Sequence, residues 1–299
     1  MTESVTVCVP ATTANLGPGF DCMALALDLW NQATFSLTGQ GIQIEVLGEG
    51  SGNIPENQKN LVARAALFLF KKQDKPMPAG LKITCINKIP LGSGLGSSAA
   101  ACLAGLMGAN ALLGTPATNE ELLRMCNELE GHPDNAAAAL LGGLIVVVQQ
   151  GSELLTQHYS VQGLRIAAVV PKINLPTAVA RAALPAKVPL NDAVFNLGRT
   201  ALVVTALRTG DFDLLRKVVD DRLHQPYRIK MISGGGAALA AARELGAAAF
   251  ISGAGPGMVA VTPNDPDPIR DAMINAFNQA GIQARGWSLS ISEKGAHLA

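Results

Sequence analysis

The sequence predicts a protein of mixed α-helices and β-strands arranged in two domains. Alternating apolar and polar residues mark short strands, whereas apolar residues spaced three and four apart mark helices. Both patterns recur along all 299 residues, a length that suits one large domain or two ordinary ones. A buried strand at 144–148 completes the first set of elements and a new alternation begins at 164. We therefore expect domains at 1–162 and 163–299.

The first domain opens with an alternating segment that proline interrupts. Val5–Val9 predicts a strand that ends at Pro10, because proline has no N–H to donate. The remaining strands are expected at 25–29, 33–37, 42–47, 81–86 and 144–148. Helices are expected at 60–70, 101–113, 120–129 and 136–141, with Asn119 as the N-cap of the third.

The second domain has its own order of elements. Strands are expected at 164–170, 248–251, 258–262 and 284–290, and helices at 191–208, 212–223, 237–245 and 268–280. The order helix, strand, strand, helix, strand at its end predicts an α+β sandwich.

Composition excludes several classes of partner. The 23 basic and 23 acidic residues give a formal charge of zero, so neither nucleic acid nor an anionic membrane is expected as a partner. No apolar run reaches the roughly 18 residues of a membrane span. The five cysteines are odd in number and irregular in spacing, which indicates free thiols in a reducing compartment. The first residues lack the pattern of a secretory signal, so we expect a cytoplasmic protein.

One glycine-rich loop carries the strongest chemical signal. It reads Pro90-Leu91-Gly92-Ser93-Gly94-Leu95-Gly96-Ser97-Ser98-Ala99-Ala100 and joins a predicted strand to a predicted helix. Backbone N–H groups and the positive end of a helix macrodipole converge on an anion in such a junction, so the loop predicts a phosphate site. It lacks the lysine that a P-loop requires, and its G-x-G-x-G spacing differs from the dinucleotide fingerprint.

Two more loops have an unusual content of small and polar residues, at 10–21 and 252–257. Together the three loops resemble the GHMP kinase superfamily. Residues 90–100 match its motif P-x-G-x-G-L-G-S-S-A-A at every defined position, and 251–256 is similar to its third motif. Within the superfamily, 10–21 and the segment Gly131-His132-Pro133-Asp134-Asn135 resemble the homoserine kinases.

The resemblance implies a fold and a reaction. The fold is a two-domain GHMP kinase fold, with an N-terminal ribosomal-protein-S5-like α/β domain and a C-terminal ferredoxin-like α+β sandwich. The reaction is phosphorylation of the side-chain hydroxyl of L-homoserine by ATP with Mg²⁺, as a step of threonine biosynthesis. The backbone of the glycine loop would hold the phosphates, and Asn60 would lie near the adenine. Ser98, with Ser97 as the alternative, and Glu128 would hold the Mg²⁺.

The same resemblance implies a pocket for a zwitterion. Arg181 and Arg228 would bind the carboxylate of homoserine, a task that suits planar bidentate guanidinium groups. Further substrate residues would be Asn15 and Asp21 for the ammonium, His132 and Asn135 for the hydroxyl, and Thr177 and Gly253. The chemical step would fall to Asn135, His132 and Glu128.

Three possibilities remain open for the proton of the hydroxyl, since Asp134, Asn135 or the phosphate itself could accept it. Two alternatives to the function also remain. The chain could phosphorylate another small alcohol such as mevalonate, or it could be a non-catalytic metabolite sensor. The resemblance further implies a homodimer.

Overall fold

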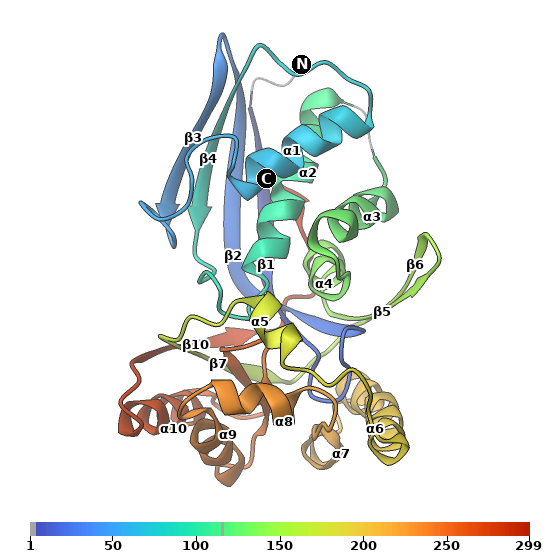
Figure 1. Cartoon of the computed structure of the whole chain (residues 1–299), viewed down its shortest axis with the longest axis vertical. Coiled ribbons are helices and arrows are strands. Elements are labelled where there is room, and N and C mark those ends of the chain that lie inside the picture. The colour runs from blue at the N-terminus through green and yellow to red at the C-terminus, as the bar shows by residue number, and fades with distance from the viewer. Residues whose placement is uncertain (1–3, 115–116) are drawn as a thin grey trace.

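The computed structural model describes residues 4–114 and 117–299. Two β-sheets lie in the upper and the lower half of the molecule in Figure 1. The upper half is mostly blue to green and the lower half mostly yellow to red, and the last residues of the chain return to the upper half. This is the mixed α+β architecture that the sequence predicts.

The upper sheet has seven strands. It follows the order β11-β1-β2-β4-β3, and β5 pairs with both β2 and β6. Only β3 and β4 pair in parallel; the other pairs in this sheet are antiparallel. The strands are β1 (Ser4–Ala14), β2 (Met23–Thr38), β3 (Gly41–Gly48), β4 (Gly80–Asn87), β5 (Leu144–Gln150), β6 (Glu153–Tyr159) and β11 (His297–Leu298).

Two strands of this sheet are longer than the sequence pattern predicts. β1 does not end at Pro10 but continues to Ala14, because the register of its pairing with β2 shifts directly after Pro10. Such an irregularity accommodates a residue that cannot donate to the ladder. β2 is one strand instead of two, and Asn31 near its middle accepts hydrogen bonds from the N–H groups of Lys88 and Ile89. β6, which the sequence pattern missed, is almost entirely exposed.

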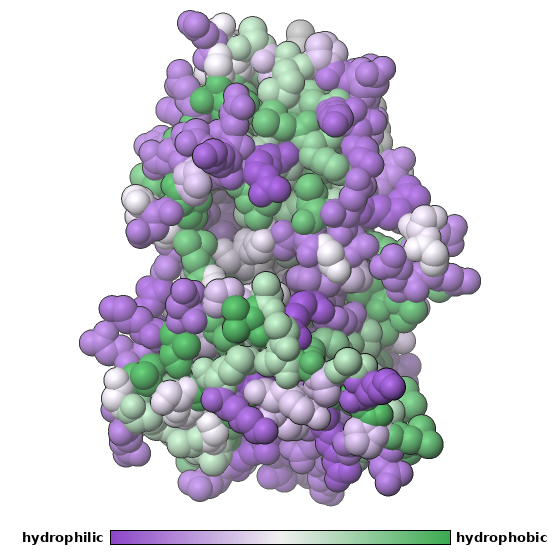
Figure 2. All heavy atoms as spheres, viewed as in Figure 1, coloured by the Kyte–Doolittle hydropathy of each residue, from purple (hydrophilic) through white to green (hydrophobic). Residues whose placement is uncertain are grey.

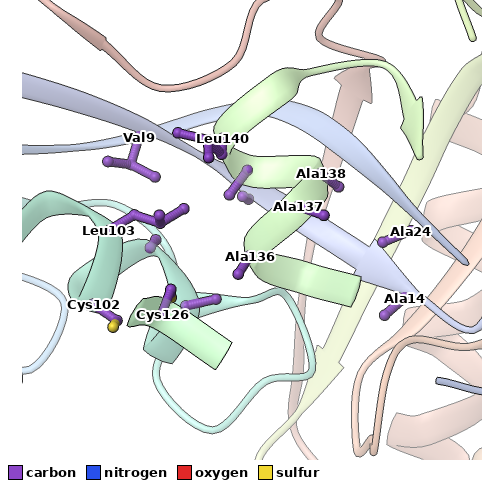
Figure 3. Packing of buried hydrophobic residues seen from close by; sticks show 14 of the residues in the cluster. Val9, Ala14, Ala24, Cys102, Leu103, Cys126, Ala136, Ala137, Ala138 and Leu140 are labelled. Atoms are coloured by element: carbon purple, nitrogen blue, oxygen red, sulfur yellow. The ribbon is translucent and has the colours of Figure 1, made fainter. Parts of the chain in front are cut away.

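Four helices belong to the upper half: α1 (Leu61–Lys72), α2 (Ser97–Leu113), α3 (Asn119–Glu130) and α4 (Asp134–Leu141). α2 and α4 pack against the sheet, and α1 and α3 pack mainly against α2. The cap of α3 is Thr118 rather than the expected Asn119, since Thr118 and Glu121 form a reciprocal capping box. α4 contains four consecutive buried alanines. Figure 3 shows the buried Ala136, Ala137, Ala138 and Leu140 of α4, and the small side chains let α4 approach β1, β2 and α2.

The lower sheet has four antiparallel strands in the order β10-β7-β9-β8. They are β7 (Arg165–Pro171), β8 (Ala248–Ile251), β9 (Met258–Thr262) and β10 (Ala284–Ser290). Helices α9 (Gly235–Glu244) and α10 (Asp267–Gln279) pack on one face of this sheet. The order of the four strands along the chain is 4-1-3-2, the ferredoxin-like arrangement that the resemblance implies.

Between β7 and α9 the chain forms four more helices: α5 (Thr177–Ala182), α6 (Leu190–Thr209), α7 (Phe212–Val218) and α8 (Gln225–Arg228), which a 3₁₀ turn, η1 (Ile229–Met231), follows. α7 ends before the predicted Leu223, since the backbone N–H groups of residues 223–225 bond to the Asp221 carboxylate instead. The short α5 carries no clear periodic pattern, and the sequence analysis missed it.

The end of the chain returns to the upper half. β11 pairs with β1, and Ser292 exchanges backbone hydrogen bonds with Ala26 and Gly143. The last residues therefore lie with the first sheet. A domain at 163–299 would instead place them with the second sheet. The division at residue 162 stays a prediction.

In the part of the chain that the structure describes, no helix is both long and apolar enough to cross a bilayer. All five cysteines are free thiols, and four of them are buried.

Candidate active site

A cavity of about 560 Å³ opens between the two halves of the molecule. In Figure 2 this region is the waist between the upper and the lower part, where pale residues of intermediate hydropathy gather. Every residue that the sequence analysis assigned to the substrate lines it: Asn15, Asp21, His132, Asn135, Thr177, Arg181, Arg228 and Gly253. Segments more than 200 residues apart in the sequence thus meet at one place.

The glycine loop forms one wall of this cavity. Gly92, Gly94 and Gly96 have positive φ angles of 58°, 79° and 72°, a backbone region that other L-residues rarely adopt. Gly96 is the N-cap of α2, and neither a capping side chain nor an acidic residue occupies the first turn. The first N–H groups of this 17-residue helix are therefore available to an anion. Of the predicted loop residues, Gly92–Gly94 and Gly96–Ala99 line the cavity.

The remaining residues of the loop have other surroundings. Leu95 and Ala100 are buried in the core. Pro90 and Leu91 line a second, larger groove of about 920 Å³, which shares Gly92 and Asn174 with the first cavity. The loop thus separates two neighbouring hollows.

The back of the glycine loop is held by both halves of the protein. From the upper half, the N–H of Thr12 donates to the carbonyl of Leu95 at 3.1 Å. From the lower half, the Ser252 hydroxyl donates to the carbonyl of Gly94 at 2.7 Å, and the N–H of Gly257 donates to that of Ser93 at 3.0 Å. A Cβ atom on Gly94 would overlap the carbonyl oxygen of Ser252, so glycine is required for this close approach.

The carboxylate of Glu128, the predicted metal ligand, lies away from the cavity. It forms an exposed ion pair with Lys72 at 2.9 Å. Glu130, two residues later, lines the cavity and accepts a hydrogen bond of 2.8 Å from the Ser98 hydroxyl. Residues two apart on a helix point in directions about 200° apart, so only one of the two glutamates can face the loop. The carboxylate beside Ser98 is that of Glu130.

His132, Asp134 and Asn135 form a second polar wall at the start of α4. Asp134 Oδ1 lies 3.1 Å from His132 Nδ1 and accepts bonds from the backbone N–H of Asn135 at 2.7 Å and from its Nδ2 at 3.2 Å. The hydrogen bond to the Asp134 carboxylate raises the pKa of His132 above its usual value. Thus His132 keeps its proton to a higher pH than a free imidazole would.

Arg181 and Asp21 line the cavity and are in direct contact with each other. The guanidinium donates from Nη1 to Oδ2 at 2.8 Å and from Nη2 to Oδ1 at 2.9 Å, a bidentate pair between α5 and the loop after β1. Hydrogen bonding to Asp21 raises the pKa of Arg181. Asn15 supports this loop, since its Oδ1 accepts from the Asp21 N–H and its Nδ2 donates to the carbonyl of Gly253.

Arg228 is the second predicted arginine, and it is only 1% exposed. Its Nη1 donates to the carbonyl of Gly253 at 3.0 Å and lies 3.2 Å from His224 Nδ1. Among the described residues, no carboxylate is within ion-pair distance of its guanidinium, and burial lowers its pKa to about 10. A buried cation without an anionic partner, on the wall of a cavity, is suited to an anionic ligand.

A buried network that the sequence analysis missed lies behind Arg228. Asp221 accepts hydrogen bonds from Asn196 Nδ2 and from the backbone at the start of α8. Asn196 Nδ2 also donates to the carbonyl of Pro18, and His224 Nε2 lies 2.8 Å from that of Gly17. An arginine can only donate and a carbonyl can only accept, so His224 is neutral with its proton on Nε2. Burial lowers its pKa in agreement.

Asn60 does not reach this site. Its side chain caps α1 by accepting from the N–H of Val62 and donates to the carbonyl of Pro55, and it lines neither hollow. A role near the adenine stays a prediction, without a contact in this structure to support it.

The chain matches two family models. The model for the N-terminal domain of GHMP kinases covers residues 60–143, and that for their C-terminal domain covers residues 203–280. The chain belongs to the GHMP kinase family. This GHMP kinase is similar in sequence to homoserine kinases of about the same length. The homoserine kinase of Moorella thermoacetica is 42% identical over 96% of this chain and 97% of its own length. That of Synechococcus sp. CC9605 is 42% identical over 99% and 96%.

Solved structures of GHMP kinases agree in fold. The homoserine kinase of Cytophaga hutchinsonii superposes with a TM-score of 0.90 at 29% identity, covering 100% of this chain and 98% of its own. The mevalonate kinase of L. major superposes with a TM-score of 0.71 at 18% identity, covering 98% and 96%, and that likeness concerns the fold alone. The two-domain GHMP kinase fold predicted from the motifs is confirmed.

Proposed function

We propose that this protein transfers the γ-phosphoryl group of ATP to the side-chain hydroxyl of L-homoserine. One observation carries the proposal: beside an uncapped helix N-terminus, the cavity holds the buried Arg228 and the facing pair of Arg181 and Asp21. An amino acid has one carboxylate and one ammonium, which these groups match in sign. The same cavity therefore has places for a phosphate and for a zwitterion.

The glycine loop and the start of α2 would bind the phosphates of ATP. Their N–H groups neutralise negative charge without side-chain cations, which suits a loop without lysine. Mg²⁺ prefers oxygen ligands and keeps several waters, and Ser98 and Glu130 offer a hydroxyl and a carboxylate that already touch. Among the described residues no cluster of three or more histidine, cysteine or acidic side chains could hold a metal, so phosphate oxygens would complete the ligand set. When bound, Mg²⁺ supplies positive charge to the phosphates.

The homoserine carboxylate would lie against Arg228 and Arg181, and its ammonium against Asp21 and Asn15. This orientation directs the terminal hydroxyl of the substrate toward His132 and Asn135, which share the cavity with the glycine loop. An amide is not basic at neutral pH, so Asn135 is no proton acceptor. A loose transition state does not require early ionisation of the hydroxyl, so the phosphoryl oxygens can take its proton.

Two alternatives are less well supported. Mevalonate has a carboxylate but no ammonium, and it would leave the Asp21 carboxylate without a cationic ligand. A metabolite sensor needs neither a metal ligand nor a reacting phosphate, whereas Ser98 and Glu130 are placed beside the glycine loop. Threonine biosynthesis follows as the expected pathway, since O-phosphohomoserine is the product. The absence of a nucleic-acid partner and the cytoplasmic location stay expectations from composition.

We also propose a homodimer. Helix α6 exposes an apolar row whose members are four, three and four residues apart: Leu190 (76% exposed), Val194 (59%), Leu197 (72%) and Ala201. Figure 2 shows green residues over α6 at the lower right. Such a spacing is typical of a seam between helices, and a second copy in an antiparallel orientation would present the same row.

The proposed reaction is tested by ADP release from MgATP in the presence of L-homoserine, mevalonate, L-serine, L-threonine or buffer alone. We expect strong turnover only with homoserine, and the product identified by ³¹P NMR as a phosphate monoester. Turnover on mevalonate alone would replace the substrate but keep the kinase. ATP binding without turnover on any of these alcohols would favour the sensor.

A further inference from the structure

Thr12 is a buried threonine of β1 whose hydroxyl is used inside the protein. Its side chain is fully buried, and Oγ1 donates to Asn135 Oδ1 at 2.7 Å. The residue also packs directly under the glycine loop, since a Cβ atom on Gly96 would overlap the Thr12 hydroxyl. Thr12 does not line the cavity, so it can influence the site only through its neighbours.

The orientation of the Asn135 amide follows from its two partners. Asp134 Oδ1 is a carboxylate oxygen that only accepts hydrogen bonds, so the group that faces it at 3.2 Å must be the Nδ2 donor. The amide oxygen then faces Thr12, whose hydroxyl donates to it. A flipped amide would place two oxygens against each other at Asp134. Of the two protons on Nδ2, one bonds to Asp134, and no partner of the other is found in the described part of the chain.

We propose that Thr12 is a positioning residue for phosphoryl transfer, which holds the Asn135 amide so that its free N–H is presented to the cavity. The inference rests on the proposed function, because it assigns the free N–H to an oxygen of the reacting γ-phosphoryl group or of the substrate hydroxyl. Toward these oxygens Asn135 donates through Nδ2, while its Oδ1 accepts from Thr12. A fixed donor is more effective than a mobile one, since it needs no reorganisation as charge develops on these oxygens.

The choice of threonine has a chemical reason. Valine has the same shape but no hydroxyl, so it would leave Asn135 Oδ1 without its donor in a buried place. The amide could then rotate, or a water could enter beneath the glycine loop. Serine keeps the donor and loses only one methyl group. The pair of substitutions therefore separates the hydrogen bond from the packing.

Steady-state kinetics of Thr12→Val, Thr12→Ser and a control test the inference. The control is Thr6→Val, which removes a hydroxyl from the same strand, where Thr6 Oγ1 lies 2.9 Å from Thr34 Oγ1. We expect kcat of Thr12→Val to fall about tenfold or more, because one transition-state donor is misplaced. The KM values for homoserine and MgATP should stay within about twofold, since substrate binding rests mainly on other groups. Thr12→Ser should retain most of kcat, and Thr6→Val all of it.

A second measurement is independent of activity. In ¹⁵N-labelled protein, the side-chain NH₂ resonances of Asn135 should shift in Thr12→Val and stay near their wild-type positions in Thr12→Ser. Thr12→Ala takes the place of Thr12→Val should the latter not fold. An unchanged kcat in Thr12→Val, or an equal loss in Thr12→Ser, would overturn the positioning role. A wild-type protein without homoserine-dependent ADP release would overturn the proposed function and this inference with it.

Discussion

Arg181 and Asp21 form a bidentate ion pair that joins the lower half of the protein to the upper half. Their side chains are 37% and 33% exposed, so the pair contributes about 0–1 kcal/mol, as is usual for solvent-accessible ion pairs. Homoserine brings one negative and one positive group, and each of these can replace one partner of the pair. Binding would thus exchange one weak ion pair for two with the substrate and leave the net charge of the site unchanged.

Substitution of Arg181 should weaken homoserine binding selectively. We expect Arg181→Ala to raise KM for homoserine roughly 10–150-fold, which corresponds to the 1.5–3 kcal/mol of a charge-assisted hydrogen bond. Arg181→Lys should rescue little, because an ammonium cannot make the bidentate contact. KM for MgATP should stay as in the wild type. Arg216→Ala, which breaks a surface pair with Asp213 on α7, is the matched control, and an unaltered homoserine KM in Arg181→Ala would contradict the assignment.

The two glutamates at the end of α3 should differ sharply in their effect on turnover. We expect Glu130→Gln to lower kcat by roughly two orders of magnitude, since a metal that neutralises phosphate charge supplies several kcal/mol. Glu128→Gln should keep nearly full activity, because its carboxylate pairs with Lys72 on the surface. Initial rates over a Mg²⁺ titration provide the measurement. The reverse result, with Glu128 essential and Glu130 dispensable, would restore the residue predicted from the sequence.

The buried His224 should make folding sensitive to acid. Its pKa is lowered by burial, so below its unfolded value of about 6.5 the unfolded chain binds a proton that the folded chain does not. This contribution to stability is present above pH 6.5 and is lost as the pH falls through the folded pKa. We expect the free energy of unfolding to drop more steeply from pH 7.5 to 5 in the wild type than in His224→Gln, as measured by urea denaturation. Parallel curves for the two proteins would show that His224 is not the group responsible.

Glycine at position 94 should be needed for stability as well as for phosphate binding. Gly94→Ala combines a strained φ of 79° with an overlap against Ser252, whereas Gly92→Ala has a φ of 58° and open space around the new Cβ. Strain of this kind costs about 1–3 kcal/mol, and each kcal/mol lowers the Tm of a chain of this size by roughly 2–4 °C. Differential scanning fluorimetry should therefore give a lower Tm for Gly94→Ala than for Gly92→Ala. Equal Tm values would mean that the contact with Ser252 is unimportant.

The apolar row on α6 should determine the oligomeric state. A glutamate in place of Leu197, which is 72% exposed, would bury a charge in the proposed seam. We expect Leu197→Glu to reduce the molar mass from twice that of one chain to that of one chain, as measured by light scattering after size exclusion. Leu245→Glu is the control, since Leu245 is 52% exposed but lies at the end of α9. A wild type that is monomeric would refute the homodimer directly.

The parts of the site that sequence could predict are those whose chemistry is contiguous along the chain. The glycine loop is one such part, because a strand, three spaced glycines and a helix start leave few other interpretations. Arg181, Arg228 and Asp21 were identified only through the family resemblance, since nothing around them in the sequence is distinctive. The structure brings all of them to the same cavity.

The parts that sequence missed depend on geometry that no local pattern encodes. Glu128 and Glu130 are chemically identical, and the choice between them depends on the rotation of α3 relative to α2. Thr12 lies next to Asn135 only because β1 continues past Pro10, which local rules predict as an end of the strand. The buried hydrogen-bond network of Asn196, Asp221 and His224 joins residues up to 28 positions apart. The end of α7 lies within this stretch, and the sequence pattern predicted that end in the wrong place.

The carbonyl oxygen of Gly253 accepts two side-chain hydrogen bonds. One comes from Asn15 Nδ2, on the side of the proposed ammonium site, and the other from Arg228 Nη1, on the side of the proposed carboxylate site. The side chains of Asn15 and Arg228 are therefore hydrogen-bonded to the same oxygen atom, which fixes the distance between them. An acceptor with a different spacing between its charged groups would not be accommodated by replacing either residue alone. A change of substrate preference in this protein should require coordinated substitutions in both halves, so single-site libraries would miss it.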